Sequence, residues 1–244
     1  MNEQIIVPAD LAHTIETMHA WLNGDPVWSY AKILEVWGPE FEMYRRRWDR
    51  QLQEKMKQAE ETGEVTFERD VVHTAMRGVS ILHLRDAWIA EFGFAIPCAE
   101  LLDELAKHRQ VVEVGAGTGY MTRLMLNRGI DVIGSNPPFN DYIFELGKYA
   151  MLALREAKTM ARANPDATVF CSWPTLRHTW FRQMLRAMKI GQRLVVIRED
   201  ACAEETAWQY LDDCFEQTAV IDIPAFETVN DYASVHVKKR NRSR

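Results

Sequence analysis

The 244-residue sequence lacks any apolar run that approaches the length of a transmembrane helix, which needs about 20 consecutive apolar residues. Its start, MNEQIIVPAD, also lacks the basic segment, apolar stretch and small-residue cleavage site of a secretory signal. Hydrophobic residues make up 47% and charged residues 26% of the chain, as in ordinary globular domains. We therefore expect a soluble, cytoplasmic protein that has no membrane partner.

Cysteine is scarce and widely spaced. None of the four cysteines forms a CxxC pair, and none of the seven histidines lies at metal-ligand spacing to them. This argues against a zinc site and against a disulfide framework. The sequence also has no internal repeat, and its length suits one large domain or a core domain with a smaller appendage.

An excess of positive charge is absent as well. The chain has 29 basic and 35 acidic residues, a net charge of −6, and five of the basic residues lie within residues 238–244. Residues 1–237 therefore have 24 basic and 35 acidic groups, a net charge of −11. Because nucleic-acid binders are usually basic, nucleic acid is not the favoured partner. We expect residues 238–244 to form a short, disordered basic tail, and the arginines at 45–47 and 50 to lie on a solvated face.

Apolar residues in the first hundred positions repeat at helical spacing. One stripe runs from Leu11 to Leu22. A second stripe predicts a long helix that starts near Pro39 and stops near residue 62, and a third predicts a helix over about 67–91. The sequence thus predicts an N-terminal helical region over residues 1–97.

From about residue 98 onward, short apolar runs alternate with helical stretches. The predicted strands are 111–114, 131–134, 168–171, 193–197, 219–223 and 233–237, with a further short strand at 142–145. The predicted helices are 119–128, 146–163, 176–188 and 203–215. This alternation predicts an α/β domain over residues 98–244, with a doubly wound, mostly parallel sheet that helices cover on both faces.

The segment VVEVGAGTGYMTRLM, residues 111–125, is an apolar strand, a turn with three glycines and then a helix. Glycines remove the Cβ atoms that would hold a ligand away from the backbone, and the following helix presents N–H groups to an anion. The spacing does not fit a dinucleotide fingerprint, a phosphate loop or a nucleophile elbow. The turn is therefore predicted to bind a ligand of another class.

At these residues the chain resembles the class I S-adenosylmethionine-dependent methyltransferases, whose first motif is an acid followed by GxGxG. The resemblance covers Glu113 and the three glycines directly, extends over the alternating elements to about residue 238, and implies a Rossmann-like fold that binds S-adenosylmethionine. It places Glu113 near the methionine amino end of the cofactor and the glycine turn under its ribose and carboxylate. The residues expected to bind the cofactor are Glu113, Gly115, Ala116, Gly117, Thr118, Gly119, Tyr120, Asn136 and Ser172.

A narrower resemblance covers residues 92–120. It is to a little-characterised group of such proteins that have an Ala-Ile-Pro segment before the first motif and a Trp-Pro-Pro segment at the fourth strand. Residues 95–97 match the first of these segments, and residues 172–175 match the second except for Thr175. This likeness implies no particular substrate.

Asn136 stands where the family has an acid that hydrogen-bonds the ribose hydroxyls. Since a carboxylate makes stronger, charge-assisted bonds, Asn136→Asp is expected to preserve or strengthen cofactor binding. Residues 136–139 also spell NPPF, the box by which amino-methylating DNA enzymes hold a flipped base. That box follows the fourth strand in the unpermuted order, whereas here it ends the second, so a proline-rigid turn under the cofactor is the preferred interpretation.

Because ligands of parallel sheets bind outside the carboxyl ends of the strands, residues after the fourth and fifth strands should face the methyl acceptor. We predict that Trp173 stacks on a planar acceptor or, by cation–π attraction, on the sulfonium of the cofactor, and that Glu199 orients or deprotonates the acceptor. The helical region would cover or shape the acceptor pocket. The predicted function is methyl transfer to a small molecule or a macromolecule. The alternatives are amine methylation of DNA or RNA and a non-catalytic S-adenosylmethionine-binding module.

Overall fold

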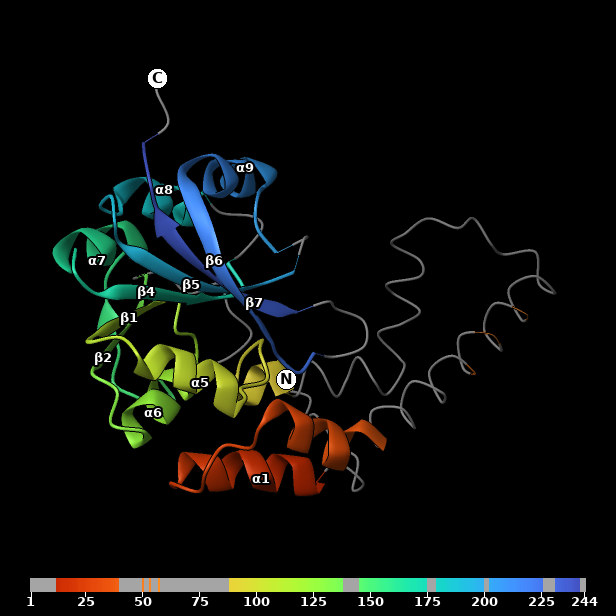
Figure 1. The fold of residues 1–244 in the computed structure, drawn as a ribbon. Coiled ribbons are helices and arrows are strands. Elements are labelled where there is room, and N and C mark those ends of the chain that lie inside the picture. Colours follow the sequence, from red (N-terminus) through yellow and green to blue (C-terminus); the bar gives the residue numbers. More distant parts are fainter. Residues whose placement is uncertain are drawn as a thin grey trace.

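The computed structural model describes residues 12–39, 50, 53, 57, 88–137, 145–174, 179–199, 202–225 and 231–241. Seven strands form a single sheet in the order β3-β2-β1-β4-β5-β7-β6 (Figure 1). The strands are β1 (Val111–Val114), β2 (Val132–Asn136), β3 (Ala153–Leu154), β4 (Thr168–Ser172), β5 (Arg193–Arg198), β6 (Phe215–Asp222) and β7 (Tyr232–Lys238). All pairings among β1 to β5 are parallel, and β7 is antiparallel to both of its neighbours. The predicted doubly wound, mostly parallel α/β fold is confirmed.

Helices cover both faces of this sheet, as Figure 1 shows. The helices with described bounds are α1 (Ala12–Leu22), α5 (Ala99–Ala106), α6 (Tyr120–Asn127), α7 (Ala157–Ala163), α8 (Trp180–Ala187) and α9 (Glu205–Cys214). Helices α1, α5 and α6 pack on one face and α7, α8 and α9 on the other. The central strand β1 is buried along its whole length because each of its faces contacts a helical layer.

The described part of the N-terminal region packs into the same core as the sheet. Trp21, Trp37 and Trp88 belong to one buried cluster with Leu101 and Val111. Their rings also contact one another, with Trp37 5.5 Å from Trp21 and 6.0 Å from Trp88 between centroids. The N-terminal region is therefore continuous with the hydrophobic layer that covers α6.

Side-chain hydrogen bonds fix α1 to α6. The hydroxyl of Tyr120, at the start of α6, donates to the carbonyl of Met18 at 3.0 Å. At the other end of α6, the amide of Asn127 donates to the carbonyls of Trp21 and Leu22 at 3.1 and 2.9 Å. These carbonyls lie at the C-terminus of α1, where a helix leaves backbone acceptors without intrahelical donors.

One predicted helix is wrong in its first half. The sequence predicts a helix over 146–163, but α7 starts only at Ala157, and the third strand β3 precedes it. The apolar residues that suggested a longer helix include Met151 and Leu154, which are 98% and 69% exposed at the edge of the sheet. The short strand predicted at 142–145 is wrong at Glu145, which is not in a strand, and its other residues lie outside the described ones.

Two further boundaries differ from prediction. Residues 30–39 are helical, ahead of the helix predicted from near Pro39 to near residue 62, and most of that helix and of the one predicted over 67–91 lies outside the described residues. Lys238, assigned to a solvated tail, is instead the last residue of β7 and fully buried. Lys239 and Arg240 also contact the fold, through Glu216 and the carbonyl of Asp213.

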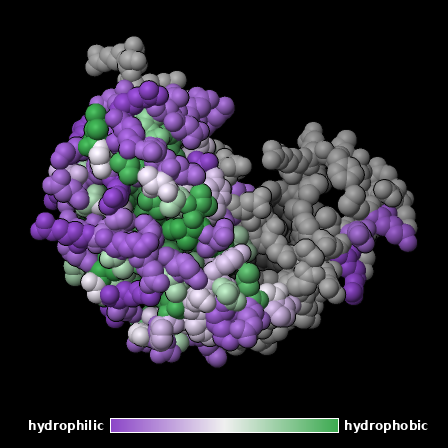
Figure 2. Space-filling model, in the orientation of Figure 1, coloured by the Kyte–Doolittle hydropathy of each residue, from purple (hydrophilic) through white to green (hydrophobic). Residues whose placement is uncertain are grey.

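The surface shown in Figure 2 is mainly hydrophilic, with smaller hydrophobic patches between charged and polar side chains. Among the described residues, no helix combines the length and apolar character that crossing a bilayer requires.

Candidate functional site

The glycine turn after β1 has a backbone that only glycine adopts readily. Gly115, Gly117 and Gly119 have φ values of +70°, +57° and +79°. An L-residue with a Cβ is strained in this left-handed region. Gly119 is also the N-cap of α6, so the turn connects the strand directly to the helix.

The glycines lack side chains for different reasons. A Cβ on Gly115 would lie 3.5 Å from Trp180, an ordinary contact that leaves this position open to a neighbouring cavity. A Cβ on Gly119 would lie 3.0 Å from the backbone nitrogen of Ala150, which is too close. Gly119 therefore allows a backbone segment to pack on the turn, whereas the backbone of Gly115 lines a cavity.

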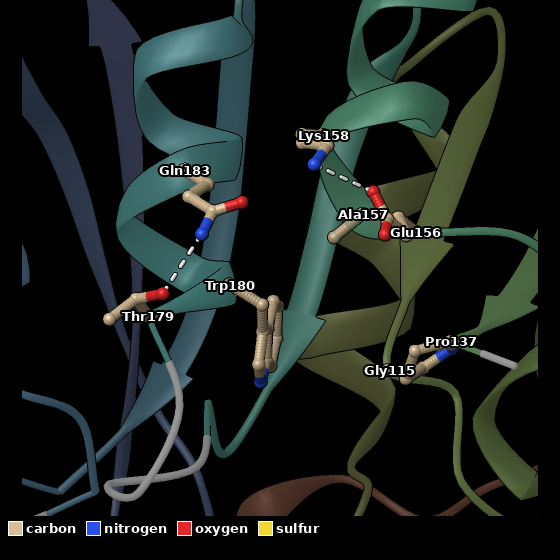
Figure 3. A pocket seen from close by; sticks show the side chains of 8 residues that line it. All are labelled: Gly115, Pro137, Glu156, Ala157, Lys158, Thr179, Trp180 and Gln183. Carbon is tan, nitrogen blue, oxygen red and sulfur yellow. Dashed lines mark hydrogen bonds and ion pairs between the residues drawn. The ribbon is translucent and has the colours of Figure 1, made fainter. Parts of the chain in front are cut away.

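Two cavities meet at this turn. The larger has a volume of about 190 Å³ and lies between the first turns of α7 and α8 (Figure 3). Figure 3 shows the Trp180 ring between the two helices, with Gly115 and Pro137 at the ends of β1 and β2. The larger cavity is lined by Gly115, Pro137, Glu156, Ala157, Lys158, Thr179, Trp180 and Gln183.

The smaller cavity lies on the other side of the turn. Its lining residues are Phe92, Gly93, Phe94, Ala95, Glu113, Gly115, Ala116, Gly117, Met121, Ser172, Trp173 and Trp180. Gly115 and Trp180 line both cavities. The two cavities lie at the carboxyl ends of β1 and β4. The strand order changes direction there, and parallel sheets bind ligands at such a point.

Glu113 lies at the base of the smaller cavity and is 2% exposed. Its carboxyl group accepts a hydrogen bond from the hydroxyl of Thr122 on α6. Gly134 on β2 makes room for that threonine, since a Cβ there would lie 2.4 Å from the Thr122 hydroxyl oxygen. Burial raises the pKa of Glu113 to about 8, against the smaller opposing effect of the Thr122 hydrogen bonds. Burial therefore favours the protonated form of the carboxyl.

Asn136 is buried at the end of β2 and binds the glycine turn itself. Its side-chain oxygen accepts the N–H of Gly117 at 2.9 Å, and its side-chain nitrogen donates to the Gly117 carbonyl at 3.0 Å. The amide thus bonds both backbone groups of Gly117. An aspartate has no donor for that carbonyl, so the structure leads us to expect that Asn136→Asp weakens the turn.

Other predicted cofactor residues are held by the N-terminal region. The hydroxyl of Thr118 donates to the carbonyl of Phe92 at 2.8 Å. Tyr120 is buried and bonds Met18, and Ala116 lines the smaller cavity. The turn is therefore attached to residues that precede the α/β domain.

Ser172 is the last residue of β4 and Trp173 follows it, and both line the smaller cavity. Trp173 is half-buried, and its ring stacks on Phe94 with centroids 5.5 Å apart and planes 14° apart. Its φ of +52° is the only positive value at a non-glycine among the described residues. Such strain, in a bulky residue, is a feature that functional sites often retain.

Glu199 lies after β5 in a turn, where its N–H approaches the Cys202 sulfur at 3.4 Å and its carbonyl accepts the Cys202 N–H at 3.1 Å. It is not among the described residues that line either cavity. The structure thus brings Trp173 to the glycine turn but does not bring Glu199 into the same cavity wall.

Sequence reasoning missed two parts of the site. Trp180 separates the two cavities, and its place in the first turn of α8 carries no local motif. Residues 92–95 line the smaller cavity because Gly93, with a φ of +113°, turns the chain there. Their position next to the Ala-Ile-Pro segment was the available signal.

No family model and no curated protein matches the chain. Solved structures similar to it include a TehB-like SAM-dependent methyltransferase from Corynebacterium glutamicum, at 16% identity, with 57% of this chain and 85% of that chain covered and a TM-score of 0.42. The CcbJ methyltransferase from Streptomyces caelestis is 15% identical, with 58% and 88% covered and a TM-score of 0.40. A mutant of MtNAS is 10% identical, with 98% and 92% covered and a TM-score of 0.43.

Proposed function

We propose that the protein is an S-adenosylmethionine-dependent methyltransferase. The observation that carries this proposal is the glycine turn at the carboxyl end of β1, with positive φ at all three glycines and a cavity on each side. It is the segment in which the sequence resembles class I methyltransferases. Gly115, which lines both cavities, provides the backbone without a side chain that a flat adenosyl group needs.

The two cavities differ in a way that suits the two halves of the cofactor. The larger cavity has Trp180 and Pro137 as flat apolar walls, which favours the adenosyl group. The smaller one contains Glu113, the one ionisable side chain among its described lining residues. A carboxyl at this position would accept a hydrogen bond from the ammonium group of the methionine half and would ionise as that cation binds.

S-Adenosylmethionine supplies an activated methyl group: the acceptor's lone pair forms the new bond to carbon while the C–S bond breaks and its electrons remain on sulfur. The protein's part is to align acceptor, methyl carbon and sulfur. Trp173, beside the turn, would orient the acceptor, and the proton that the acceptor loses would pass to solvent.

The alternative in which Asn136 binds a flipped DNA base is less consistent with the contacts of its side chain. That arrangement uses the asparagine amide for the target amine, whereas here the amide bonds both backbone groups of Gly117. We therefore assign Asn136 to the support of the cofactor turn.

Calorimetry with S-adenosylmethionine and S-adenosylhomocysteine tests the proposal directly. We expect saturable binding of both, and conversion of the first into the second when a cell extract supplies the acceptor. Absence of binding by the folded protein would refute the proposal. Binding without turnover in any extract fraction would favour the non-catalytic module, and turnover abolished by nuclease treatment would favour a nucleic-acid acceptor.

A further inference from the structure

A short segment between β2 and β3 packs directly on the glycine turn. We call residues 147–150 the strap. The N–H of Gly147 donates to the carbonyl of Gly117 at 3.0 Å, and the N–H of Tyr149 donates to the carbonyl of Thr118 at 2.9 Å. The strap therefore bonds two consecutive peptide groups of the turn. It is also the backbone that lies against Gly119.

One carboxylate, Glu91, holds the strap from the side of the N-terminal region. The Tyr149 hydroxyl donates to one Glu91 oxygen, and the Lys148 ammonium lies 2.6 Å from the other. The His19 ring nitrogen, on α1, lies 3.6 Å from the first oxygen. Burial alone would raise the pKa of Glu91, but the hydrogen bonds from Lys148 and Tyr149 outweigh it and lower the pKa below its ordinary value.

Ring contacts extend the same connection. The Tyr149 ring stacks on Phe92, with centroids 6.3 Å apart and planes 16° apart, and meets Tyr120 edge-on at 5.8 Å. Phe92 lines the smaller cavity, and its backbone carbonyl accepts a hydrogen bond from the Thr118 hydroxyl. Glu91 thus joins α1, the strap and the cavity wall at one point.

We propose that Glu91 is a positioning residue for the cofactor site, which acts by holding the strap against Gly117 and Thr118. This inference rests on the proposed function. While both strap bonds are made, they restrain the peptide groups of Gly117 and Thr118, so the turn keeps the conformation in which Gly115 lines both cavities. When the strap is released, Gly117 retains Asn136 as its partner, but the Thr118 carbonyl loses its donor.

The apparent affinity for the cofactor is proportional to the fraction of molecules in the binding-competent conformation. If release of the strap leaves about a fifth of the molecules with a binding-competent turn, the apparent affinity for the cofactor falls about fivefold. Because Glu91 does not contact the reacting atoms, its loss should change the rate of methyl transfer at saturating cofactor much less than the affinity for the cofactor.

Hydrogen exchange and calorimetry on Glu91→Ala test this. We expect faster exchange of the Gly147 and Tyr149 amides by about tenfold and roughly fivefold weaker binding of S-adenosylhomocysteine. Glu91→Gln, which keeps an acceptor for Tyr149, should restore much of both. Tyr149→Phe provides a second route to the same loss if Glu91→Ala does not fold.

Glu104→Ala is the matched control, because Glu104 also pairs with a lysine and a histidine, Lys107 at 2.5 Å and His108 at 3.7 Å, but on α5. It should leave exchange in the strap and cofactor affinity unchanged. The inference is overturned if the strap amides of Glu91→Ala exchange as in the wild type, or if they are released while affinity stays the same. A wild type that binds no cofactor contradicts the proposed function instead, and exchange in the strap then still decides whether Glu91 holds it.

Discussion

The two ends of the sheet differ in how completely their buried ionisable side chains are hydrogen-bonded. At the amino end of β5, the Lys238 ammonium donates to the carbonyls of Leu185, Arg186 and Met188 at 2.9, 3.1 and 2.8 Å. All three of its donors are used, at the C-terminus of α8, where the helix dipole favours a cation. Nearby, the Gln192 amide bonds the carbonyls of Asn164 and Ala167 and accepts the N–H of Lys189.

At the carboxyl end, the buried carboxyl of Glu113 is less completely hydrogen-bonded. Both hydrogen bonds that lower the pKa of Glu113 come from Thr122, and they do not outweigh its burial. The same end has the strained backbone of Trp173 and the three positive-φ glycines. Buried polar groups whose hydrogen bonds are all made within the protein stabilise the fold. Buried groups that can still form hydrogen bonds, next to a strained backbone, are suited to binding a ligand. The experiments below test this division.

The largest expected effect is on stability at the amino end. Lys238→Met keeps most of the side-chain volume but leaves three buried carbonyls without their donor, which should cost about 3 to 5 kcal/mol of unfolding free energy. Urea denaturation measures this, and Lys239→Met, which removes an exposed ion pair with Glu216, is the control and should change little. Cofactor affinity per folded molecule should stay at the wild-type level. A Lys238→Met variant as stable as the wild type would contradict the assigned role.

Next in size is a loss of binding at the carboxyl end. Gly117→Val places a branched side chain in the wall of the smaller cavity, at a φ of +57°, and should weaken S-adenosylhomocysteine binding by about 100-fold or more. Gly129→Val has a similar φ of +74° with nothing within 4 Å of its Cβ position. It therefore controls for backbone strain. Unchanged affinity in a folded Gly117→Val protein would remove the turn from the site.

Glu113 should make stability fall as pH rises. Its folded pKa of about 8 exceeds the ordinary value of 4.5, so the folded state binds the extra proton between these values. This contribution is complete below pH 4.5 and is lost as pH rises toward 8, by at most about 1.4 kcal/mol per pH unit. Denaturation from pH 5 to 8 should show that slope in the wild type and a smaller one in Glu113→Gln. An identical slope in the variant would exclude Glu113 as its source.

His236 should produce a slope of the opposite sign. It is buried on β7 beside Ser234, and burial lowers its pKa from 6.5 to about 4. Its contribution is complete above pH 6.5 and is lost as pH falls toward 4, over a narrower range than for Glu113. His236→Gln should flatten the unfolding free energy between these pH values. If acid denaturation is unchanged in that variant, other groups cause it.

The smallest effects are expected at Trp173. Trp173→Ala should lower methyl transfer about tenfold through loss of the ring while cofactor affinity stays within a few fold. Trp173→Gly should show the same loss of transfer but about 1 kcal/mol more stability than the alanine variant, because glycine relieves the positive φ. Normal transfer per folded molecule in a destabilised Trp173→Ala protein would show that the ring only packs.

The sequence was sufficient where local pattern and tertiary environment agree. Strand β1 was predicted with its observed bounds, because an apolar run before a glycine turn has few other solutions. The predicted helix over 146–163 was wrong in its first half because apolar residues in a sequence predict burial. Met151 and Leu154 are apolar yet exposed at a sheet edge. Strand β3 pairs at only two positions, too short for a periodic signal.

The site was predictable only in the part that is contiguous in sequence. The glycine turn and the residues after β4 could be identified, since the chemistry there depends on neighbours in the chain. The partner of Asn136 lies 19 residues away, and the partner of Glu91 on the strap lies 58 residues away. No sequence pattern predicts either hydrogen bond, because the carboxylate or amide and its partner come together only when the sheet forms.

The attachment of α1 to α6 also has a consequence for synthesis on the ribosome. The carbonyl of Trp21 receives its hydrogen bond from Asn127, 106 residues later in the chain. At about 5 to 20 residues per second, α1 emerges roughly 5 to 20 s before the helix on which it packs. Throughout that interval its tryptophan, buried in the finished protein, is without its native cover. Helix α1 thus cannot reach its native position until α6 has been made, and a nascent chain that stalls before α6 exposes an apolar surface to chaperones or to other chains.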